Sequence, residues 1–282
     1  MTNDPIARPD AWLRLRAFTP ARIALGRAGA SLPTSELLDF QLSHARARDA
    51  VHAPFDSAEL ARRIQQLGIT TICLSSAALN RQVFLTRPDL GRQLNDASRS
   101  TLAGAAVALC DQSDSSQTAT PKGVDLTIVV SDGLSALAAE RQVVPLLAAW
   151  LPLLRAERRT ISPVVVVERG RVFVEDEIGA AFSAQVAVIL IGERPGLGSP
   201  DSLGAYLVYA PRPGLSDAHR NCVSNIRPQG LSPENAAQKL HYLFRESLAR
   251  QLSGIALKDE SLAIDRASQD PPVDDARLLT DG

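Results

Sequence analysis

The sequence has no long hydrophobic run and few cysteines, and both shortages exclude whole classes of protein. Its longest apolar stretch, Val143–Leu154, contains Pro145 and Pro152 and falls well short of the roughly 20 apolar residues that span a bilayer. The N-terminal residues lack the apolar segment of a secretory signal. Three cysteines, none in a CxxC pair, show no zinc-binding spacing and suit a reducing compartment. We therefore predict a cytoplasmic protein without a membrane span.

An excess of charge of one sign is also missing. With 30 basic and 31 acidic side chains, the net charge of -1 gives no overall attraction to nucleic acid or anionic lipid, so neither is a predicted partner. Lysine is scarce and occurs only at positions 122, 239 and 258. Two interpretations stand: codon usage favours arginine, or some arginines bind phosphate or carboxylate or anchor subunit interfaces. Aromatic residues make up only 4% of the 282 residues, but a hydrophobic content of 45% is ample for a buried core.

Composition divides the chain into five parts. A polar run without large apolar groups, residues 111–123, is a predicted linker or loop between a mainly helical part, residues 22–110, and a Rossmann-like domain, residues 124–257. Residues 1–21 and the acidic tail at residues 258–282 are expected to be flexible.

The mainly helical part contains two well-marked helices, predicted at residues 34–49 and 56–68. Asp56 is a suitable N-cap for the second of them. A β-branched, apolar segment at residues 69–74 predicts a strand. The turn that follows leads into a short predicted helix at residues 88–98.

From residue 124 onward, short aliphatic runs alternate with turns rich in Gly, Asp and Pro, which is typical of α/β proteins. The run at residues 186–191 is apolar at every position, so we expect a central strand that is covered on both faces. The predicted fold is α/β: a Rossmann-like, mostly parallel sheet flanked by helices and preceded by a smaller helical N-terminal part. The further strands are expected at residues 126–130, 164–167, 172–174, 205–209 and 222–226.

Two long helices are expected to accompany these strands. The first, residues 134–157, contains Pro145 and Pro152, which should kink or split it. The second spans residues 232–252, with Gly254 as its terminator.

Three polar, glycine-bearing loops leave aliphatic strands: Ser131-Asp132-Gly133, Arg169-Gly170-Arg171 and Gly192–Ser199. In open α/β sheets, ligands bind at the carboxyl ends of the strands, where backbone amides and helix N-termini are free. The loops therefore predict one shared binding rim, where glycines let the main chain approach a large ligand. The simpler interpretation is that each loop only forms a tight turn.

An acidic run, Glu175–Glu177, follows shortly after the second of these loops. We expect it to be a solvated face of the protein. The alternative is that its carboxylates accept hydrogen bonds from amide groups of a ligand.

Catalytic clusters are not visible in the sequence. The histidines at positions 44, 52, 219 and 241 are scattered, so no metal site is predicted, and there is neither a GxSxG elbow nor a P-loop lysine. The spacing GxxxGxG of the Gly192–Ser199 loop misses the dinucleotide fingerprint. No catalytic residue is therefore assigned to this chain.

One near-motif involves cobalamin chemistry. The segment Asp217–Cys222 has the spacing of the DxHxxG signature by which some cobalamin proteins supply an axial histidine to cobalt, but Cys222 replaces the glycine. A surface histidine, His219, ahead of a strand is the more economical interpretation. Cys222 is expected to be a small buried side chain rather than a reactive thiol, and its place at the start of a strand leaves ligand contact open.

Four strings occur in a fixed order along the chain. They are Phe84–Arg92, Val130–Ser135, Gly192–Gly198, and Cys222–Ile226 with Ser253–Ile255. Together they resemble the small (light) subunit of ethanolamine ammonia-lyase, over about residues 22–257.

The resemblance implies an adenosylcobalamin-dependent lyase that converts ethanolamine to acetaldehyde and ammonia by a radical mechanism. This chain would be one of two subunit types, active only with the large subunit, in an assembly of six large and six small chains. The small subunit covers the cobalamin with its Rossmann-like sheet at the interface. The implied cofactor contacts are a hydrogen bond between Glu193 and the cofactor, and packing by Val172 and Cys222.

The resemblance also bears on cobalt and on location. The dimethylbenzimidazole of the cofactor remains on cobalt in this family, so no protein histidine ligand is implied. Arg87 and Arg194 are assigned to contact with either the cofactor or the large subunit, without a choice between them. Because the N-terminus is shorter than in members delivered to bacterial microcompartments, encapsulation is doubtful.

Two other functions compete with this one. The first is a stand-alone Rossmann-like enzyme that binds a dinucleotide, against which the glycine spacing and the missing catalytic clusters argue. The second is a non-catalytic scaffold subunit whose arginine-rich surface only holds partners.

Overall fold

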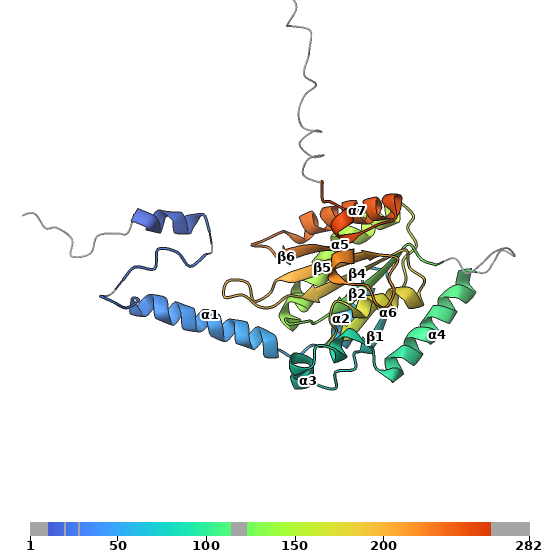
Figure 1. The fold of residues 1–282 in the computed structure, drawn as a ribbon, viewed down its shortest axis with the longest axis horizontal. Helices are drawn as coiled ribbons and strands as arrows, with labels where there is room; N and C mark the ends of the chain where they lie inside the picture. The colour runs from blue at the N-terminus through green and yellow to red at the C-terminus, as the bar shows by residue number, and fades with distance from the viewer. Residues whose placement is uncertain (1–10, 20, 28, 114–122, 261–282) are drawn as a thin grey trace, which may run out of the picture.

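The structure is a computed structural model that describes residues 11–19, 21–27, 29–113 and 123–260. Its centre is a six-stranded sheet in the order β1-β3-β2-β4-β5-β6 (Figure 1). The first four strands in this order are parallel, whereas β5 and β6 are antiparallel additions at one edge. The strands are β1 (Thr71–Ser75), β2 (Leu126–Ser131), β3 (Val164–Glu168), β4 (Val186–Gly192), β5 (Leu203–Tyr209) and β6 (Arg220–Ile226).

Helices cover both faces of this sheet and form a three-layer arrangement (Figure 1). One face packs against α2, α5 and α7, and the other against α4 and α6. The helices are α1 (Thr34–His52), α2 (Ser57–Gln65), α3 (Arg81–Thr86), α4 (Asp96–Ser113), α5 (Ala136–Ala156), α6 (Val174–Ala181) and α7 (Pro233–Arg250). Short 3-10 turns are η1 (Ala11–Ala17), η2 (Leu90–Arg92), η3 (Asp217–His219) and η4 (Gly254–Ala256). The predicted α/β class with a mostly parallel, helix-flanked sheet is confirmed.

The central strands are buried because helices lie on both of their faces. Every residue of β2 and β4 is buried, as the continuous apolar run at residues 186–191 predicted. Successive side chains of a strand point to opposite faces, so Ile128 and Val130 contact the α5 layer while Val129 contacts the α6 layer. The aliphatic side chains therefore form two main cores, one on each face of the sheet.

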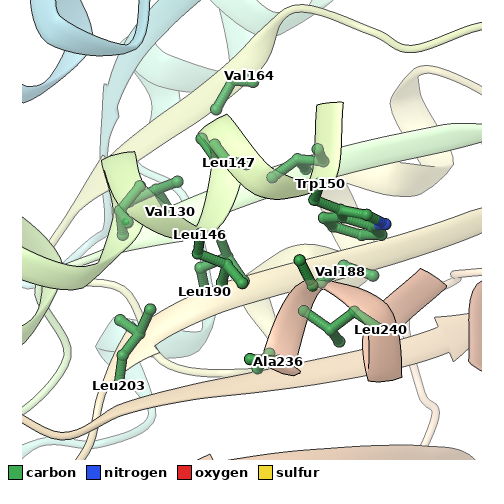
Figure 2. Close-up of a cluster of buried hydrophobic side chains, with 14 of the residues drawn as sticks. Val130, Leu146, Leu147, Trp150, Val164, Val188, Leu190, Leu203, Ala236 and Leu240 are labelled. Atoms are coloured by element: carbon green, nitrogen blue, oxygen red, sulfur yellow. The ribbon is translucent and has the colours of Figure 1, made fainter. Parts of the chain in front are cut away.

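The larger core lies between the sheet, α5 and α7. Figure 2 shows Leu146, Leu147 and Trp150 of α5 above Val188, with Leu240 of α7 beside them. Among the described helices, α5 alone is long and apolar enough to cross a bilayer, and half of that stretch is buried inside the protein. Packing in this core accounts for its composition, since core helices of globular proteins meet the same criterion.

Two helix predictions required correction. The helix at residues 134–157 was expected to kink or split at its prolines, and the split is wrong, because α5 is one continuous element through Pro145 and Pro152. Both prolines are exposed, and the opposite face of α5 packs in the core, which supports the helix despite the hydrogen bonds that proline removes. The second helix ends within two residues of its predicted end, at Arg250, but its terminator is not Gly254, because Gln251 itself adopts the left-handed conformation with φ 54°.

Two short elements were also predicted wrongly. Residues 88–98 form η2 and an extended stretch instead of one helix, and α4 begins only at Asp96. Residues 172–174 were expected to form a strand, but Val172 and Phe173 form a turn and Val174 is the first residue of α6. A run of three apolar residues is too short for strand propensity to determine its secondary structure. The packing of α6 in the tertiary structure determines it instead.

The remaining predicted elements are confirmed within a few residues at their ends. In α2, the Asp56 side chain accepts a hydrogen bond from the Glu59 amide at 2.9 Å, as an N-cap should. The sheet also takes β1 from the predicted helical part, ahead of the predicted linker. The division into five parts stays a prediction, because residues 1–10, 114–122 and 261–282 lie outside the described ranges.

The N-terminal arm, defined here as η1 and α1, projects away from the sheet domain (Figure 1). Arg16 of η1 forms an ion pair with Glu36 of α1 at 2.8 Å, which joins the two elements. Only Ala50 of α1 is buried. The arm and the segment joining its two elements carry exposed apolar side chains at Trp12, Leu13, Leu15, Phe18, Leu32, Leu37, Leu38, Phe40 and Leu42. Clustered apolar surface of this kind is typical of an interface with another protein.

The contribution of Trp150 to stability is testable. Its ring is fully buried and meets Phe244 of α7 edge to face, with centroids 6.5 Å apart. We expect Trp150→Ala to lower the free energy of unfolding by about 3–5 kcal/mol in denaturant titrations, because the cavity left behind cannot collapse fully. Ile255→Ala is the matched control, since that side chain is 84% exposed. Equal losses in both variants would contradict the packing described here.

Candidate ligand-binding site

The three predicted loops meet at the carboxyl edge of the parallel strands. The Gly170 amide donates to Ser131 Oγ at 2.9 Å, and the Arg169 amide donates to Asp132 Oδ1 at 2.6 Å. The Leu134 amide donates to the carbonyl of Gly192 at 2.9 Å, which brings in the third loop. The three loops therefore meet as predicted, and ligand binding at the rim that they form stays a prediction.

The glycines of this rim mostly serve the packing of the loops against each other. A Cβ atom on Gly192 would lie 2.1 Å from the Ser135 carbonyl oxygen, and one on Gly133 would lie 2.4 Å from the Gly192 carbonyl oxygen. Gly133 also has φ +50°. Side chains at either position would force the loops apart. Gly198, in contrast, faces open space and leaves the main chain accessible.

The crevice between β2 and β3 is filled by the chain itself. The helices that follow these strands, α5 and α6, lie on opposite faces of the sheet, and doubly wound proteins bind nucleotides at such a point. Here Asp132 is buried and Arg81 Nη1 donates to its Oδ2 at 2.8 Å. Burial raises the pKa of Asp132, and the Arg81 guanidinium acts in the opposite direction. This arrangement argues against a dinucleotide at the usual place.

A cavity of about 490 Å³ lies on the α6 face of the sheet, next to the loop after β3. We call it the rim cavity. It is lined by Pro88, Arg92, Arg171, Val172, Phe173, Tyr206, Asp217, Arg220 and Cys222. Two of the three predicted contact residues, Val172 and Cys222, thus share one cavity although they are far apart in sequence. A second cavity of about 480 Å³ lies at the amino-terminal edge of the sheet and contains none of the predicted residues.

Cys222 is exposed at the wall of the rim cavity, so its predicted burial is wrong. It lies opposite Tyr206 in the register of β5 and β6, and the thiol and the phenol hydrogen-bond. Loss of surrounding water raises the pKa of the Cys222 thiol, with the negative charge of Glu193 acting in the same direction. Burial likewise raises the pKa of Tyr206. Both groups therefore present neutral S–H and O–H groups at neutral pH.

Glu193 does not line the rim cavity but lies beside it. Its Oε2 accepts hydrogen bonds from the Ser202 hydroxyl and from the Asn225 amide, the latter at 3.2 Å. Its charge is near enough to raise the pKa values of Tyr206 and Cys222. Among the described residues, no group donates a hydrogen bond to Glu193 Oε1. One carboxylate oxygen is therefore held in place and the other is left to accept from a ligand.

A buried cluster of charges supports the opposite wall. Arg220 Nε donates to Glu175 Oε1 at 2.9 Å, and Arg220 Nη2 donates to Asp176 Oδ2 at 2.5 Å. All three side chains are buried, so the predicted solvated face at Glu175–Glu177 is wrong. Glu177 alone is partly exposed, and it pairs with Arg99. The run begins α6, where the N-terminal end of the helix dipole favours carboxylates.

Sequence reasoning missed Arg220 as a residue that shapes the cavity. Its guanidinium lies 4.3 Å from the centre of the Phe173 ring, next to Val172, and its backbone begins the strand that carries Cys222. The cluster thus joins the two walls of the rim cavity. An arginine at the start of a strand gives no signal in the sequence that its partners lie in a distant acidic run.

The protonation of this cluster gives a testable pH dependence. Burial raises the pKa of Glu175 well above its ordinary value, and Arg220 opposes that shift. The folded chain then holds a proton that the unfolded chain releases above about pH 4.5, so the free energy of unfolding falls as the pH rises. Glu175→Gln removes this titration. We expect the melting temperature of the variant, relative to the parent, to increase between about pH 5 and pH 8.

Thermal unfolding across that range measures the effect. Glu177→Gln is the control, because Glu177 is partly exposed and pairs with Arg99 instead. Its difference from the parent should not change with pH in the same way. A constant difference between Glu175→Gln and the parent would rule out a buried proton on Glu175.

The near-motif at Asp217–Cys222 is a local turn in the structure. His219 Nδ1 lies 2.9 Å from Ser216 Oγ and caps η3. This confirms the interpretation of His219 as an exposed histidine ahead of a strand. Of the two unassigned arginines, Arg87 pairs with Asp89 at 2.7 Å on the surface, whereas Arg194 is exposed and forms no ion pair within the described ranges.

Fold and site together define a class: a Rossmann-like α/β protein whose nucleotide crevice is filled and whose cavity lies on one face of the sheet. The model of the family described as ethanolamine ammonia-lyase light chain matches residues 9–258. The chain therefore belongs to the family of ethanolamine ammonia-lyase small subunits, as the four strings of residues indicated.

Curated relatives agree with this assignment. A protein of Pseudomonas syringae pv. tomato named ethanolamine ammonia-lyase small subunit is 54% identical over 92% of this chain and 86% of its own length. Proteins of the same name from Pseudomonas fluorescens and Pseudomonas putida are 53% and 54% identical, over 92% and 89% of this chain and 90% and 88% of their own lengths.

Proposed function

We propose that this chain is the small subunit of an adenosylcobalamin-dependent ethanolamine ammonia-lyase and that it binds and shields the cobalamin at the interface with the large subunit. One observation carries the cofactor part of the proposal. Val172 and Cys222 line a single cavity and Glu193 lies beside it, although the three belong to separate loops and strands. Family membership over residues 9–258 supports the enzyme assignment.

The chemistry of the rim cavity fits this cofactor. A corrin is an apolar ring system whose edge carries neutral amide groups, each with N–H donors and a carbonyl acceptor. Val172 offers an apolar contact and Glu193 Oε1 offers an acceptor. The neutral Tyr206 and Cys222 groups hydrogen-bond to each other, which leaves one of their two protons to donate to a ligand. No histidine is among the residues that line the cavity, which suits a cobalt ion whose lower ligand comes from the cofactor.

Bound adenosylcobalamin supplies the radical chemistry that turns ethanolamine into acetaldehyde and ammonia. This chain contributes binding and shielding. Its apolar wall and the Glu193 carboxylate, which would accept a hydrogen bond from a corrin amide, would orient the corrin. The loops joined through Asp132 would help to exclude water at the sheet edge.

The N-terminal arm supports the need for a partner. Apolar side chains of the arm and of the segment joining its two elements are exposed in the isolated chain, among them Leu38 at 58% and Phe18 at 85%. Cover by a large subunit removes this surface from water. We propose six large and six small chains in the assembly, located in the cytoplasm. A chain with only three cysteines, none of them in a CxxC pair, suits that compartment.

The role of Glu193 is directly testable. We expect Glu193→Ala to weaken cobalamin binding to the reconstituted complex by roughly tenfold or more, because a hydrogen bond to a charged group is worth about 1.5–3 kcal/mol. Absorbance titration with cobalamin gives the affinity, and sedimentation gives the extent of assembly, which should not change. Glu234→Ala, at an exposed site in the first turn of α7, is the control. Unchanged affinity in Glu193→Ala would remove Glu193 from the site.

Co-expression distinguishes the proposed function from its two alternatives. With the large subunit, we expect ammonia release from ethanolamine that depends on added adenosylcobalamin, and neither subunit alone should release ammonia. A stand-alone dinucleotide enzyme would act without the partner. A scaffold subunit would bind the partner but leave cobalamin occupancy unchanged. Activity of the large subunit alone, equal to that of the complex, would contradict the proposal.

A further inference from the structure

Positive charge gathers on one side of the rim cavity. Arg92 and Arg171 line the cavity, and Arg194 of the glycine loop lies close enough to act on Arg171 electrostatically. None of these three arginines forms an ion pair with a carboxylate within the part of the chain that the structure describes. The neighbouring Arg81 and Arg220, in contrast, are neutralised by Asp132 and by the Glu175–Asp176 pair.

Aromatic rings hold two of these guanidinium groups in place without cancelling their charge. The Arg171 guanidinium lies 4.2 Å from the centre of the Phe84 ring, and its Nη2 donates to the Phe84 carbonyl at 3.0 Å. The Arg92 guanidinium lies 4.9 Å from the centre of the Phe173 ring. Stacking of this kind orients the planar donor groups and leaves their charge available.

The arrangement is incomplete as it stands. Arg171 Nε is buried and has no hydrogen-bond partner. Burial and the positive charges of Arg81, Arg92 and Arg194 lower the pKa of Arg171. Holding these cations together costs free energy, and an anion placed between them would relieve the repulsion. Among the residues that line the cavity, Asp217 is the only carboxylate, and it belongs to η3, just before β6.

We propose that Arg92 and Arg171, with Arg194 nearby, form an anion subsite of the rim cavity that binds the phosphodiester of a nucleotide-bearing corrinoid. The inference rests on the proposed function, because cobalamin binding places a corrinoid in this cavity. The amide groups on the corrin edge are neutral, so the phosphodiester of the nucleotide loop is the anionic group that such a ligand brings. Guanidinium groups bind phosphate oxygens through paired, charge-assisted hydrogen bonds. In this arrangement, Glu193 accepts a hydrogen bond from the corrin amides, and the arginines donate hydrogen bonds to the phosphate.

Comparing two corrinoids tests this subsite. Cyanocobalamin carries the nucleotide loop, whereas cyanocobinamide has the same corrin and amides but lacks the loop and its phosphodiester. In complexes reconstituted with the large subunit, we expect Arg92→Gln and Arg171→Gln each to weaken cyanocobalamin binding by roughly 10- to 100-fold. Cyanocobinamide affinity should change less than about twofold. Arg171→Lys, which keeps the charge, should recover part of the cyanocobalamin affinity.

Controls separate the subsite from folding and assembly. Arg250→Gln, whose parent arginine pairs with Glu246 on the surface of α7, should alter neither affinity. Because Arg92 is exposed, its variant should keep the parent melting temperature even if Arg171→Gln does not. Equal losses for both corrinoids, or no loss for either, would overturn the phosphate subsite and leave the proposed function standing. If the arginine variants lost assembly with the large subunit but kept their cyanocobalamin affinity, the arginines would bind an acidic group of the large subunit. That result would also overturn the phosphate subsite. A parent complex that binds neither corrinoid would instead refute the proposed function itself.

Discussion

The candidate site depends on one buried guanidinium. Arg220, at the start of β6, forms ion pairs with Glu175 and Asp176 in the first turn of α6. Its guanidinium also stacks on the Phe173 ring, in the turn before α6. Two carboxylates and one cation buried together favour a proton on Glu175, because an unpaired buried charge costs several kcal/mol. The cluster therefore holds the strand that carries Cys222 at a defined distance from the turn that carries Val172. The rim cavity is the space that this connection maintains.

The filled crevice at the carboxyl edge explains why this Rossmann-like sheet offers a different surface from a dinucleotide enzyme. Asp132 joins the loops after β2 and β3, and Arg81 covers it. Gly133 and Gly192 let the neighbouring loops approach too closely for a ligand to enter between them. The rim cavity instead lies on the α6 face, where Tyr206 and the arginines lie. This open face suits the proposed cofactor, a large flat molecule shared with a second subunit, better than a deep crevice would.

Much of the fold was predictable because local rules and tertiary context agree there. The apolar run of β4 specifies burial on both faces, and Asp56 specifies the start of α2. Prediction failed where the conformation or burial of a short segment depends on residues that are distant in the sequence. Residues 172–174 have strand propensity but form the turn that leads into α6 and its first residue. Glu175 is an acidic residue, which sequence rules place on the surface, but it is buried beside Arg220. Cys222 was expected to be buried, yet its strand lies at an open edge of the sheet.

By itself, the sequence determined the α/β class, the central strands, the loops that form the rim and the family, because each depends on residue patterns within a short stretch or on strings shared with relatives. The tertiary structure alone decided which residues meet. It placed Val172 and Cys222 in one cavity, set Glu193 beside it, and left Arg92 and Arg171 without an ion pair among the described residues. The charge balance and the burial of a side chain depend on all the residues around it, many of them from distant parts of the chain. Only the folded structure determines which residues those are.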